Sequence, residues 1–280
     1  MQKKILAIND ISCFGKCSLT VALPILSAAG AETSVIPTAV LSTHTGGFPG
    51  YTYRDLTADI PKIAEHWKSV GLSFDAIYTG FLGSFEQLDL VSRLIGEFRT
   101  PETLVCVDPV MGDNGKLYAS FGPDFPAGMA KFCRGADLIT PNLTEAALLL
   151  GEPYRNEALS QPYVEELLRR LGELGPHHVV LTGVGFEETR TGCAFYDRVT
   201  GDIGYAFSEK LPGMYHGTGD IFASALVGAV GNAIPLRGAA QIAADYTAGC
   251  IRRTFQAGTD VRFGVNFEDG LPDYIKAVRG

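Results

Sequence analysis

The sequence lacks a long apolar segment. Its longest uncharged run, residues 33–53, contains two prolines, three glycines and a histidine, which a membrane-spanning helix of about 20 apolar residues would not tolerate. Near the N-terminus, Lys3 and Lys4 precede only four apolar residues before Asn9, and a secretory signal needs a longer apolar stretch. We therefore expect a cytoplasmic protein with no membrane segment.

An excess of positive charge is also absent. Lysine and arginine total 23 residues against 31 aspartates and glutamates, so the net charge is −8. A chain of this charge has no overall basic field to hold nucleic acid or an anionic membrane. The sequence therefore predicts no nucleic-acid partner, and any phosphate group must be bound by local features.

Cysteine is scarce and no segment separates the chain into parts. Six cysteines in 280 residues fit isolated thiols better than a disulfide framework. Cys13 and Cys17 are the one close pair, and no second Cys or His pair supplies the remaining ligands of a zinc site. Low-complexity linkers, charge blocks and internal repeats are absent as well. We therefore expect a single domain over residues 1–280.

Short apolar runs alternate with helix-length segments along the chain. The predicted strands are residues 4–8, 33–37, 76–79, 104–107, 138–139 and 179–182. The predicted helices are residues 18–29, 53–70, 85–98, 143–150, 162–174, 220–230 and 236–255. This βαβ order predicts an α/β fold with a mostly parallel sheet, helices on both faces and ligands at the carboxyl ends of the strands. Residues 194–196 and 203–207 flank a polar turn and predict an antiparallel hairpin at the sheet edge.

The most informative segment is the run Gly217, Thr218, Gly219 and Asp220, which opens an apolar helix. The first turn of a helix has free backbone N–H groups and carries the positive end of the dipole, so an anion such as phosphate can bind there. An ordinary acidic residue near a helix start, after a glycine-rich turn, is the structural alternative.

Further acidic and amide side chains follow two predicted strands. Asp108 and Asp113 come directly after the strand at 104–107, and Asn142 and Glu145 follow Thr140 after the strand at 138–139. Mg²⁺ prefers hard oxygen ligands and keeps several waters, so one or two carboxylates and nucleotide phosphates suffice to hold it. Each motif alone is compatible with a turn or a helix cap, but together they predict a magnesium-nucleotide site.

These motifs resemble the pyridoxal and pyridoxamine kinase family of the ribokinase-like superfamily. The resemblance covers nearly the full chain and rests on residues 8–10 (IND), 44–46 (HTG), 79–84 (TGFLGS), 108–113 (DPVMGD), 140–145 (TPNLTE) and 217–220 (GTGD). It implies a ribokinase-like three-layer sandwich, with a mostly parallel central sheet between two helical layers and an antiparallel edge. It also implies ATP-dependent phosphorylation of a hydroxymethyl group on a heteroaromatic ring.

The resemblance also implies roles for individual residues. Asp220 matches the catalytic base, and the N–H groups of Gly217, Thr218 and Gly219 match the anion hole. Asp108 and Glu145 match the Mg²⁺ environment. The nucleotide side is implied to include Asp113, Thr140, Asn142, Glu145, Thr182 and Gly183.

On the substrate side, the resemblance places four residues around the ring: Asp10, His44, Thr45 and Phe81. Tyr118 would belong to a flap over the site, and the turn-rich segment 112–118 has the composition of a mobile cover. Pyridoxal kinases commonly have a serine at the position of Asp10. An ionised Asp10 could only accept a hydrogen bond from the ring nitrogen. Alternatively, its carboxylate could turn away from the ring and bind a loop N–H or the start of a helix.

The predicted function is phosphorylation of the 5′-hydroxymethyl group of pyridoxal, pyridoxamine or pyridoxine, with ATP as co-substrate and Mg²⁺ as cofactor. A hydroxymethylpyrimidine kinase of thiamine synthesis is the alternative, because both rings are flat heteroaromatics with a hydroxymethyl arm. A noncatalytic ligand-binding relative is a third reading, which the joint presence of Asp220, Asp108 and Glu145 opposes. The resemblance also implies a homodimer and leaves open a requirement for a monovalent cation.

Overall fold

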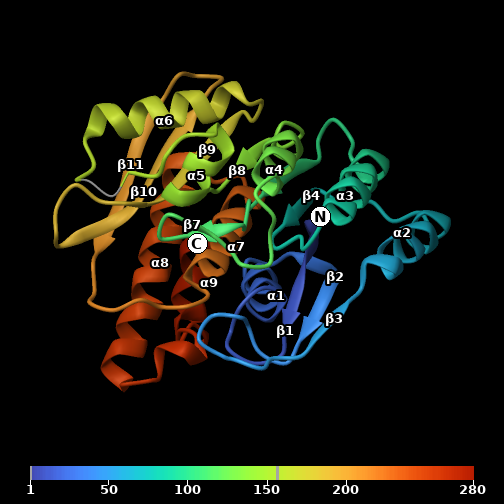
Figure 1. The fold of residues 1–280 in the computed structure, drawn as a ribbon, viewed down its shortest axis with the longest axis horizontal. Helices are drawn as coiled ribbons and strands as arrows, with labels where there is room; N and C mark the ends of the chain where they lie inside the picture. Colours follow the sequence, from blue (N-terminus) through green and yellow to red (C-terminus); the bar gives the residue numbers. More distant parts are fainter. Residues whose placement is uncertain (1, 156–157) are drawn as a thin grey trace.

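The fold is built on one large sheet, seen in a computed structural model that describes residues 2–155 and 158–280 (Figure 1). Over these residues the sheet has nine strands in the order β11-β10-β9-β8-β5-β4-β1-β2-β3. The strands are β1 (Lys4–Ser12), β2 (Glu32–Leu41), β3 (Tyr53–Asp55), β4 (Ala76–Thr79), β5 (Leu104–Val107), β8 (Leu138–Ile139), β9 (His178–Val184), β10 (Arg190–Asp197) and β11 (Ile203–Glu209). Two further short strands, β6 (Gly112–Asp113) and β7 (Lys116–Leu117), form a separate hairpin.

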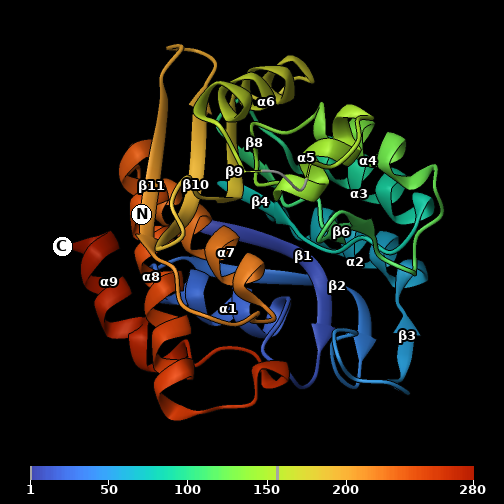
Figure 2. The same ribbon diagram turned by 60° about the vertical axis from the view of Figure 1, so that its left-hand side comes forward.

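The strands from β2 to β9 in this order run parallel, and the two edges are antiparallel. The predicted hairpin forms one edge, since β9 pairs with β10 and β10 with β11. At the other edge β3 pairs with β2 (Figure 2). The prediction of a mostly parallel sheet with an antiparallel edge is therefore confirmed, with a second antiparallel edge added.

Helices cover both faces of the sheet, as the prediction required. One face packs against α1 (Leu19–Ala28), α7 (Thr218–Gly231), α8 (Leu236–Ala257) and α9 (Leu271–Arg279). The other face packs against α2 (Ile60–Ser69), α3 (Phe85–Phe98), α4 (Phe125–Cys133), α5 (Leu143–Leu150) and α6 (Gln161–Glu173). Figure 2 shows these two layers on opposite sides of the sheet. Within the described ranges, no helix is both long and apolar enough to cross a bilayer.

Strand β1 is an interior strand of the sheet, between β4 and β2, and is buried on both faces. Ile5 and Ala7 point into the core below α1 and α7, whereas Leu6 and Ile8 point into the core below α3. This alternation follows from the two-residue period of a strand. It places Asn9, the next residue in the series of Ile5 and Ala7, on the α7 face.

Some predicted elements differ from the structure. Residues 53–55 form β3 rather than the start of a helix, and a short 3₁₀ turn, Thr57–Asp59, leads into α2 at Ile60. Pairing with residues 39–41 overrides the local helical pattern there. Strand β2 also continues past Pro37, where the register with β1 shifts and accommodates the missing N–H. Helices α4 and α9 were not predicted.

Candidate active site

The GTGD run forms the start of α7 at the carboxyl edge of the sheet. Gly217 caps the helix with φ of 78°, in the left-handed region. A Cβ atom there would lie 2.3 Å from the Lys16 carbonyl oxygen, so a side chain at this position would clash. The first helical hydrogen bond runs from Ile221 N to Gly217 O. The N–H groups of Gly217, Thr218 and Gly219 therefore lie before the helical ladder and can face an anion.

Asp220 lies in this first turn, and its carboxylate faces the end of β1. Burial is the main effect on its pKa and raises it to about 6. The Ser18 backbone N–H and the Asn9 side chain oppose that shift, and the negative charge of Asp10 adds to it. A carboxyl group with this pKa is ionised at neutral pH, yet its proton affinity is higher than that of an exposed aspartate.

Asp108 and Glu145 are brought together from two neighbouring strand ends. Both are nearly buried, with 5% and 4% of their surfaces exposed. Burial raises the pKa of both groups, to about 8 for Glu145, and the charge of Glu145 further raises the pKa of Asp108. Two carboxyl groups in this setting are stabilised by a proton or a cation between them.

The residues at the site fit a magnesium ion that is held mainly by water and phosphate. Over the described part of the chain, no group of three or more His, Cys, Asp and Glu side chains is arranged as a metal cage. Asp108 and Glu145 supply hard oxygen donors. Because burial disfavours their ionised forms and raises both pKa values, a bound cation would stabilise the two carboxylates. Mg²⁺ typically binds one or two carboxylates in this way, with the rest of its shell from water and nucleotide phosphates.

A cavity of about 460 Å³ joins these groups and extends toward the hairpin edge of the sheet. All predicted nucleotide-side residues line it: Asp113, Thr140, Asn142, Glu145, Thr182 and Gly183. Asp108, Tyr118 and the GTGD residues line it too. The ends of β5, β8 and β9 and the start of α7 thus meet at one cavity, as the parallel sheet predicts.

Several lining residues were missed by sequence reasoning. They come from β10 and β11, from the loop before α7, from α7 itself and from α8: Thr191, Gly192, Ser208, Glu209, Lys210, Leu211, Gly213, Met214, Tyr215, Phe222, Ala244, Thr247, Ala248 and Ile251. These residues belong to no recognisable motif. The antiparallel hairpin and α8 could be predicted, but not that they would form the far wall of this cavity.

The predicted substrate-side residues lie beside the cavity rather than in its lining, with the exception of Tyr118. The Asp10 carboxylate accepts hydrogen bonds from Ser18 Oγ at 2.6 Å and Ser12 Oγ at 3.0 Å. Burial raises its pKa, and these two hydroxyls partly oppose the shift. Ser12 and Ser18 therefore hold the Asp10 carboxylate near the start of α1, and a contact with a ring nitrogen stays a prediction.

Neither ring nitrogen of His44 is free. Nε2 lies 2.6 Å from the Arg262 carbonyl oxygen, and Nδ1 accepts a hydrogen bond from Gly46 N at 3.1 Å. The ring also packs on His216, with 4.9 Å between the ring centroids. His44 thus joins the loop after β2, which includes the exposed Thr45, to the loop before α7 and to the 3₁₀ segment Val261–Phe263.

Phe81 lies in the turn after β4. Its backbone N–H donates to Asn9 Oδ1 at 2.8 Å, and its carbonyl oxygen accepts from Thr38 Oγ1 at 3.1 Å. Its ring packs against Phe121, with 5.5 Å between the centroids.

The predicted flap is the β6–β7 hairpin. Asn114 stands at its tip with φ of 52°, and the Gly115 N–H donates to Thr144 Oγ1 at 2.9 Å. Asn114 Nδ2 also lies 3.9 Å from Met214 Sδ, which belongs to the loop before α7. The flap therefore contacts the opposite wall of the cavity, and Tyr118 at its base lines the space beneath.

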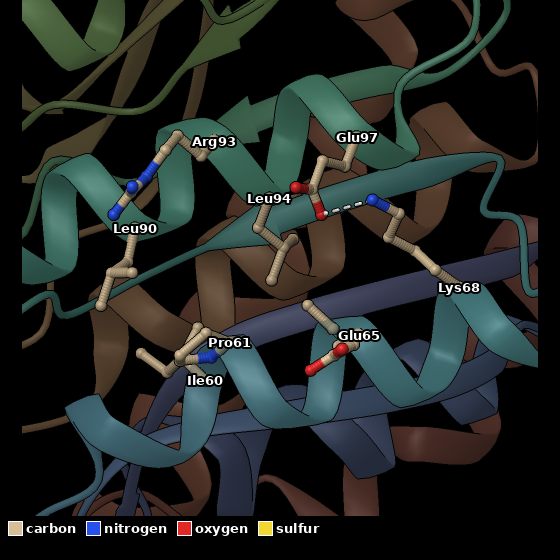
Figure 3. A pocket seen from close by; sticks show the side chains of 9 residues that line it. Ile60, Pro61, Glu65, Lys68, Leu90, Arg93, Leu94 and Glu97 are labelled. Atoms are coloured by element: carbon tan, nitrogen blue, oxygen red, sulfur yellow. Dashed lines mark ion pairs between the residues drawn. The ribbon is translucent and has the colours of Figure 1, made fainter.

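A second hollow lies between α2 and α3 and has a different character (Figure 3). Its apolar lining includes Ile60 and Leu94, and Lys68 at its rim pairs with Glu97 at 3.5 Å. None of its lining residues comes from a strand end or a helix start that the motifs mark. It offers no arrangement for phosphate or proton transfer.

A helix start with free N–H groups, beside buried carboxylates at the carboxyl edge of a mostly parallel sheet, is the arrangement expected of a kinase of the ribokinase-like class. The sequence model of the phosphomethylpyrimidine kinase family matches residues 26–264. The chain belongs to this family and, within the ribokinase-like superfamily, to the group that contains the pyridoxal kinases.

Solved structures of relatives support this placement. A protein of Bacteroides thetaiotaomicron assigned to the phosphomethylpyrimidine kinases is 41% identical, with a TM-score of 0.94 over 97% of this chain and 93% of that chain. A pyridoxal kinase of Lactobacillus plantarum is 33% identical, with a TM-score of 0.90 over 99% and 98% of the two chains. The pyridoxal kinase of Granulibacter bethesdensis is 28% identical over 91% of each chain.

Proposed function

We propose that this protein phosphorylates the 5′-hydroxymethyl group of pyridoxal, pyridoxamine or pyridoxine, with ATP as phosphoryl donor and Mg²⁺ as cofactor. One observation carries the choice of substrate. The Bacteroides thetaiotaomicron relative was crystallised with pyridoxal in a second form, and in that form it is 40% identical over 98% of this chain. The pyridoxal kinase of Lactobacillus plantarum supports the same choice.

In this proposal, Asp220 is the general base. The substrate hydroxyl oxygen attacks the γ-phosphorus of ATP, its proton passes to the Asp220 carboxylate, and the bond from the γ-phosphorus to the ADP oxygen breaks. The pKa of about 6 fits this role, since the group is ionised at neutral pH and can still take a proton. The N–H groups of Gly217, Thr218 and Gly219 stabilise the charge on the transferring phosphoryl group.

The remaining residues hold the reactants. Asp108 and Glu145 would hold Mg²⁺, which neutralises charge on the phosphates when bound. The nucleotide would lie along Asn142, Thr182 and Gly183, and closure of the β6–β7 flap with Tyr118 would exclude water. The pyridine ring would lie near Asp10, Thr45 and Phe81, with His44 holding the loop between them.

Assembly and location are part of the same proposal. We infer a cytoplasmic homodimer, by analogy with the family that the sequence motifs resemble. Sedimentation analysis of the purified protein tests the dimer directly.

Hydroxymethylpyrimidine is the competing substrate, and the matched family is named after a related pyrimidine, a phosphomethylpyrimidine. The transfer chemistry is the same for both rings, so the GTGD run and the carboxylates do not discriminate between them. A product assay with ATP over pyridoxal, pyridoxamine, pyridoxine, hydroxymethylpyrimidine and ribose separates the candidates. The highest kcat/KM is expected for a B6 vitamer, and a higher value for hydroxymethylpyrimidine would overturn the proposal.

A further inference from the structure

Asn9 is a fully buried polar residue that none of the roles above uses. It lies near the end of β1 with 0% of its surface exposed. Its Oδ1 atom accepts two backbone hydrogen bonds, from Asp10 N at 2.9 Å and from Phe81 N at 2.8 Å. Because two donors meet this atom, it must be the amide oxygen, and the orientation of the amide group is fixed.

The other end of this amide has no hydrogen-bond partner among the described residues. Nδ2 is buried, and no donor or acceptor contact satisfies it. The turn after β4 leaves space for it only because residue 80 is glycine, since a Cβ atom on Gly80 would lie 2.1 Å from Nδ2. A buried amide nitrogen in a fixed orientation is costly unless it serves an acceptor nearby.

The acceptor that the fold brings to this side of β1 is the Asp220 carboxylate, which is not hydrogen-bonded to Nδ2 in the structure. The alternation of β1 places Asn9 on the face covered by α7, and Asp220 lies in the first turn of α7. The Asn9 side chain is one of two groups that lower the pKa of Asp220, the other being the Ser18 backbone N–H. Both therefore stabilise the ionised form of this carboxylate.

Negative or ionisable groups surround Asp220 on its other sides. Asp10 raises the pKa of Asp220 from the end of β1. Asp220 in turn raises the pKa of four groups: Cys17 before α1, Tyr78 on β4, Asp108 after β5 and Tyr118 at the base of the β6–β7 flap. The amide donor of Asn9 thus opposes a local excess of negative charge.

We propose that Asn9 is a positioning residue for the phosphoryl-transfer step: when the substrates are bound, Nδ2 donates to the Asp220 carboxylate and keeps it oriented toward the substrate hydroxyl. This inference rests on the proposed role of Asp220 as base. A short carboxamide suits the position because it accepts from two N–H groups at one end and donates at the other. Aspartate has the same shape but no donor when ionised.

The substitution Asn9→Asp tests this assignment. It keeps an oxygen for Asp10 N and Phe81 N and replaces the donor with a second acceptor. We expect kcat to fall by about 10- to 100-fold, the range for one hydrogen bond to a charged group, with KM for pyridoxal within about threefold of the wild type. Because a second carboxylate raises the pKa of Asp220, the acidic limb of the kcat profile should move to higher pH by about one pH unit.

Asn232→Asp is the matched control. Asn232 Nδ2 donates to the carbonyl oxygens of Ala29 and Gly228 at 2.9 and 2.8 Å, at the end of α7 opposite to Asp220. The same loss of a donor there should lower Tm and leave kcat and its pH profile unchanged. If Asn9 had a purely structural role, Asn9→Asp would likewise lower Tm and leave kcat and its pH profile unchanged.

A double-mutant cycle with Asp220→Asn shows whether Asn9 acts through Asp220. If it does, Asn9→Asp lowers kcat in the wild-type background and has little further effect in the Asp220→Asn background. An equal effect in both backgrounds, or an unchanged kcat and pH limb for Asn9→Asp alone, would overturn the inference. If Asp220→Asn itself keeps full activity, the proposed base is wrong, which is a separate result.

Should Asn9→Asp fail to fold by circular dichroism, Asn9→Ala takes its place in the same cycle. It removes both ends of the amide, so KM is expected to rise together with the fall in kcat. The kcat effect should still vanish in the Asp220→Asn background, and its persistence there would overturn the inference.

Discussion

Asn142 and Glu145 cap each other at the start of α5. Asn142 Oδ1 accepts from Glu145 N at 2.9 Å, and Glu145 Oε2 accepts from Asn142 N at 2.9 Å, while Glu145 Oε1 accepts from Met111 N at 3.1 Å. This reciprocal capping box fixes a buried carboxylate beside Asp108 before any ligand binds. The residue that the family resemblance assigns to the metal is thus oriented by the local structure of its own helix.

Glu145→Gln and Asp108→Asn should lower activity in a manner that added Mg²⁺ partly reverses. Each substitution removes one negative charge from the proposed metal environment. Glutamine keeps one acceptor oxygen and loses the other, so either Asn142 N or Met111 N is left without an acceptor, and Tm of Glu145→Gln should fall below that of the wild type. The measurement is kcat/KM for ATP over a range of Mg²⁺ concentrations.

Asp220→Asn serves as the control for that series, because loss of a base is not a loss of metal affinity. Its activity should not respond to added Mg²⁺. Activity that is insensitive to both substitutions, or wild-type activity that is the same with and without excess EDTA, would contradict a magnesium-nucleotide site.

Asp10→Ser should narrow the preference for pyridoxal over hydroxymethylpyrimidine. An ionised carboxylate can only accept, so it favours a ring nitrogen that carries a proton, and a pyridine is the more basic ring. The ratio of the two kcat/KM values should fall by the equivalent of about 1–3 kcal/mol. Measuring both kcat/KM values at several pH values, for the wild type and Asp10→Ser, tests this prediction. An unchanged ratio would show that Asp10 only binds Ser12 and Ser18 and does not contact the ring.

Tyr78→Phe should leave the free energy of unfolding unchanged or raise it. The Tyr78 side chain is 1% exposed, and its hydroxyl has no hydrogen-bond partner in the part of the chain that is described. Burial, Asp108 and Asp220 raise the pKa of this hydroxyl and the nearby Ser224 side chain partly opposes the shift, so the hydroxyl is neutral. Removing an unpartnered buried hydroxyl while keeping the ring loses no hydrogen bond.

Tyr274→Phe is the matched comparison for stability. The Tyr274 hydroxyl donates to the Ala225 carbonyl oxygen at 3.0 Å, and the residue is equally buried. Its loss should cost about 1 kcal/mol. Denaturant unfolding of both variants measures the difference, and a larger loss for Tyr78→Phe would show that its hydroxyl has a partner, such as a buried water.

The sequence predicted the parts of the site that depend on local chemistry. A glycine-flanked carboxylate at a helix start and acidic residues after buried strands have recognisable patterns, and parallel strands bring their carboxyl ends to one edge. Gly217, Asp220 and Glu145 were therefore found, and the structure places all three at one cavity.

Other parts depend on contacts between distant segments. Thr247 and Ser208 line the cavity because α8 and β11 pack beside each other, which no local pattern shows. Asn9 was part of a quoted motif. The environment of the two ends of its amide could not be predicted, because it depends on Phe81 and Asp220, which are distant from Asn9 in the sequence. Residues 53–55 were expected in a helix because pairing with β2 is not encoded in their own pattern.

The central claim is that Asp220 is the base for phosphoryl transfer to a B6 vitamer. The most direct test is the rate of pyridoxal 5′-phosphate formation from ATP and pyridoxal as a function of pH, for the wild type and Asp220→Asn. Since the base must be ionised, wild-type activity should be lost as the pH falls through about 6. Asp220→Asn should lower kcat by about 10²- to 10⁴-fold, and a variant that keeps more than about a third of wild-type turnover would contradict the account.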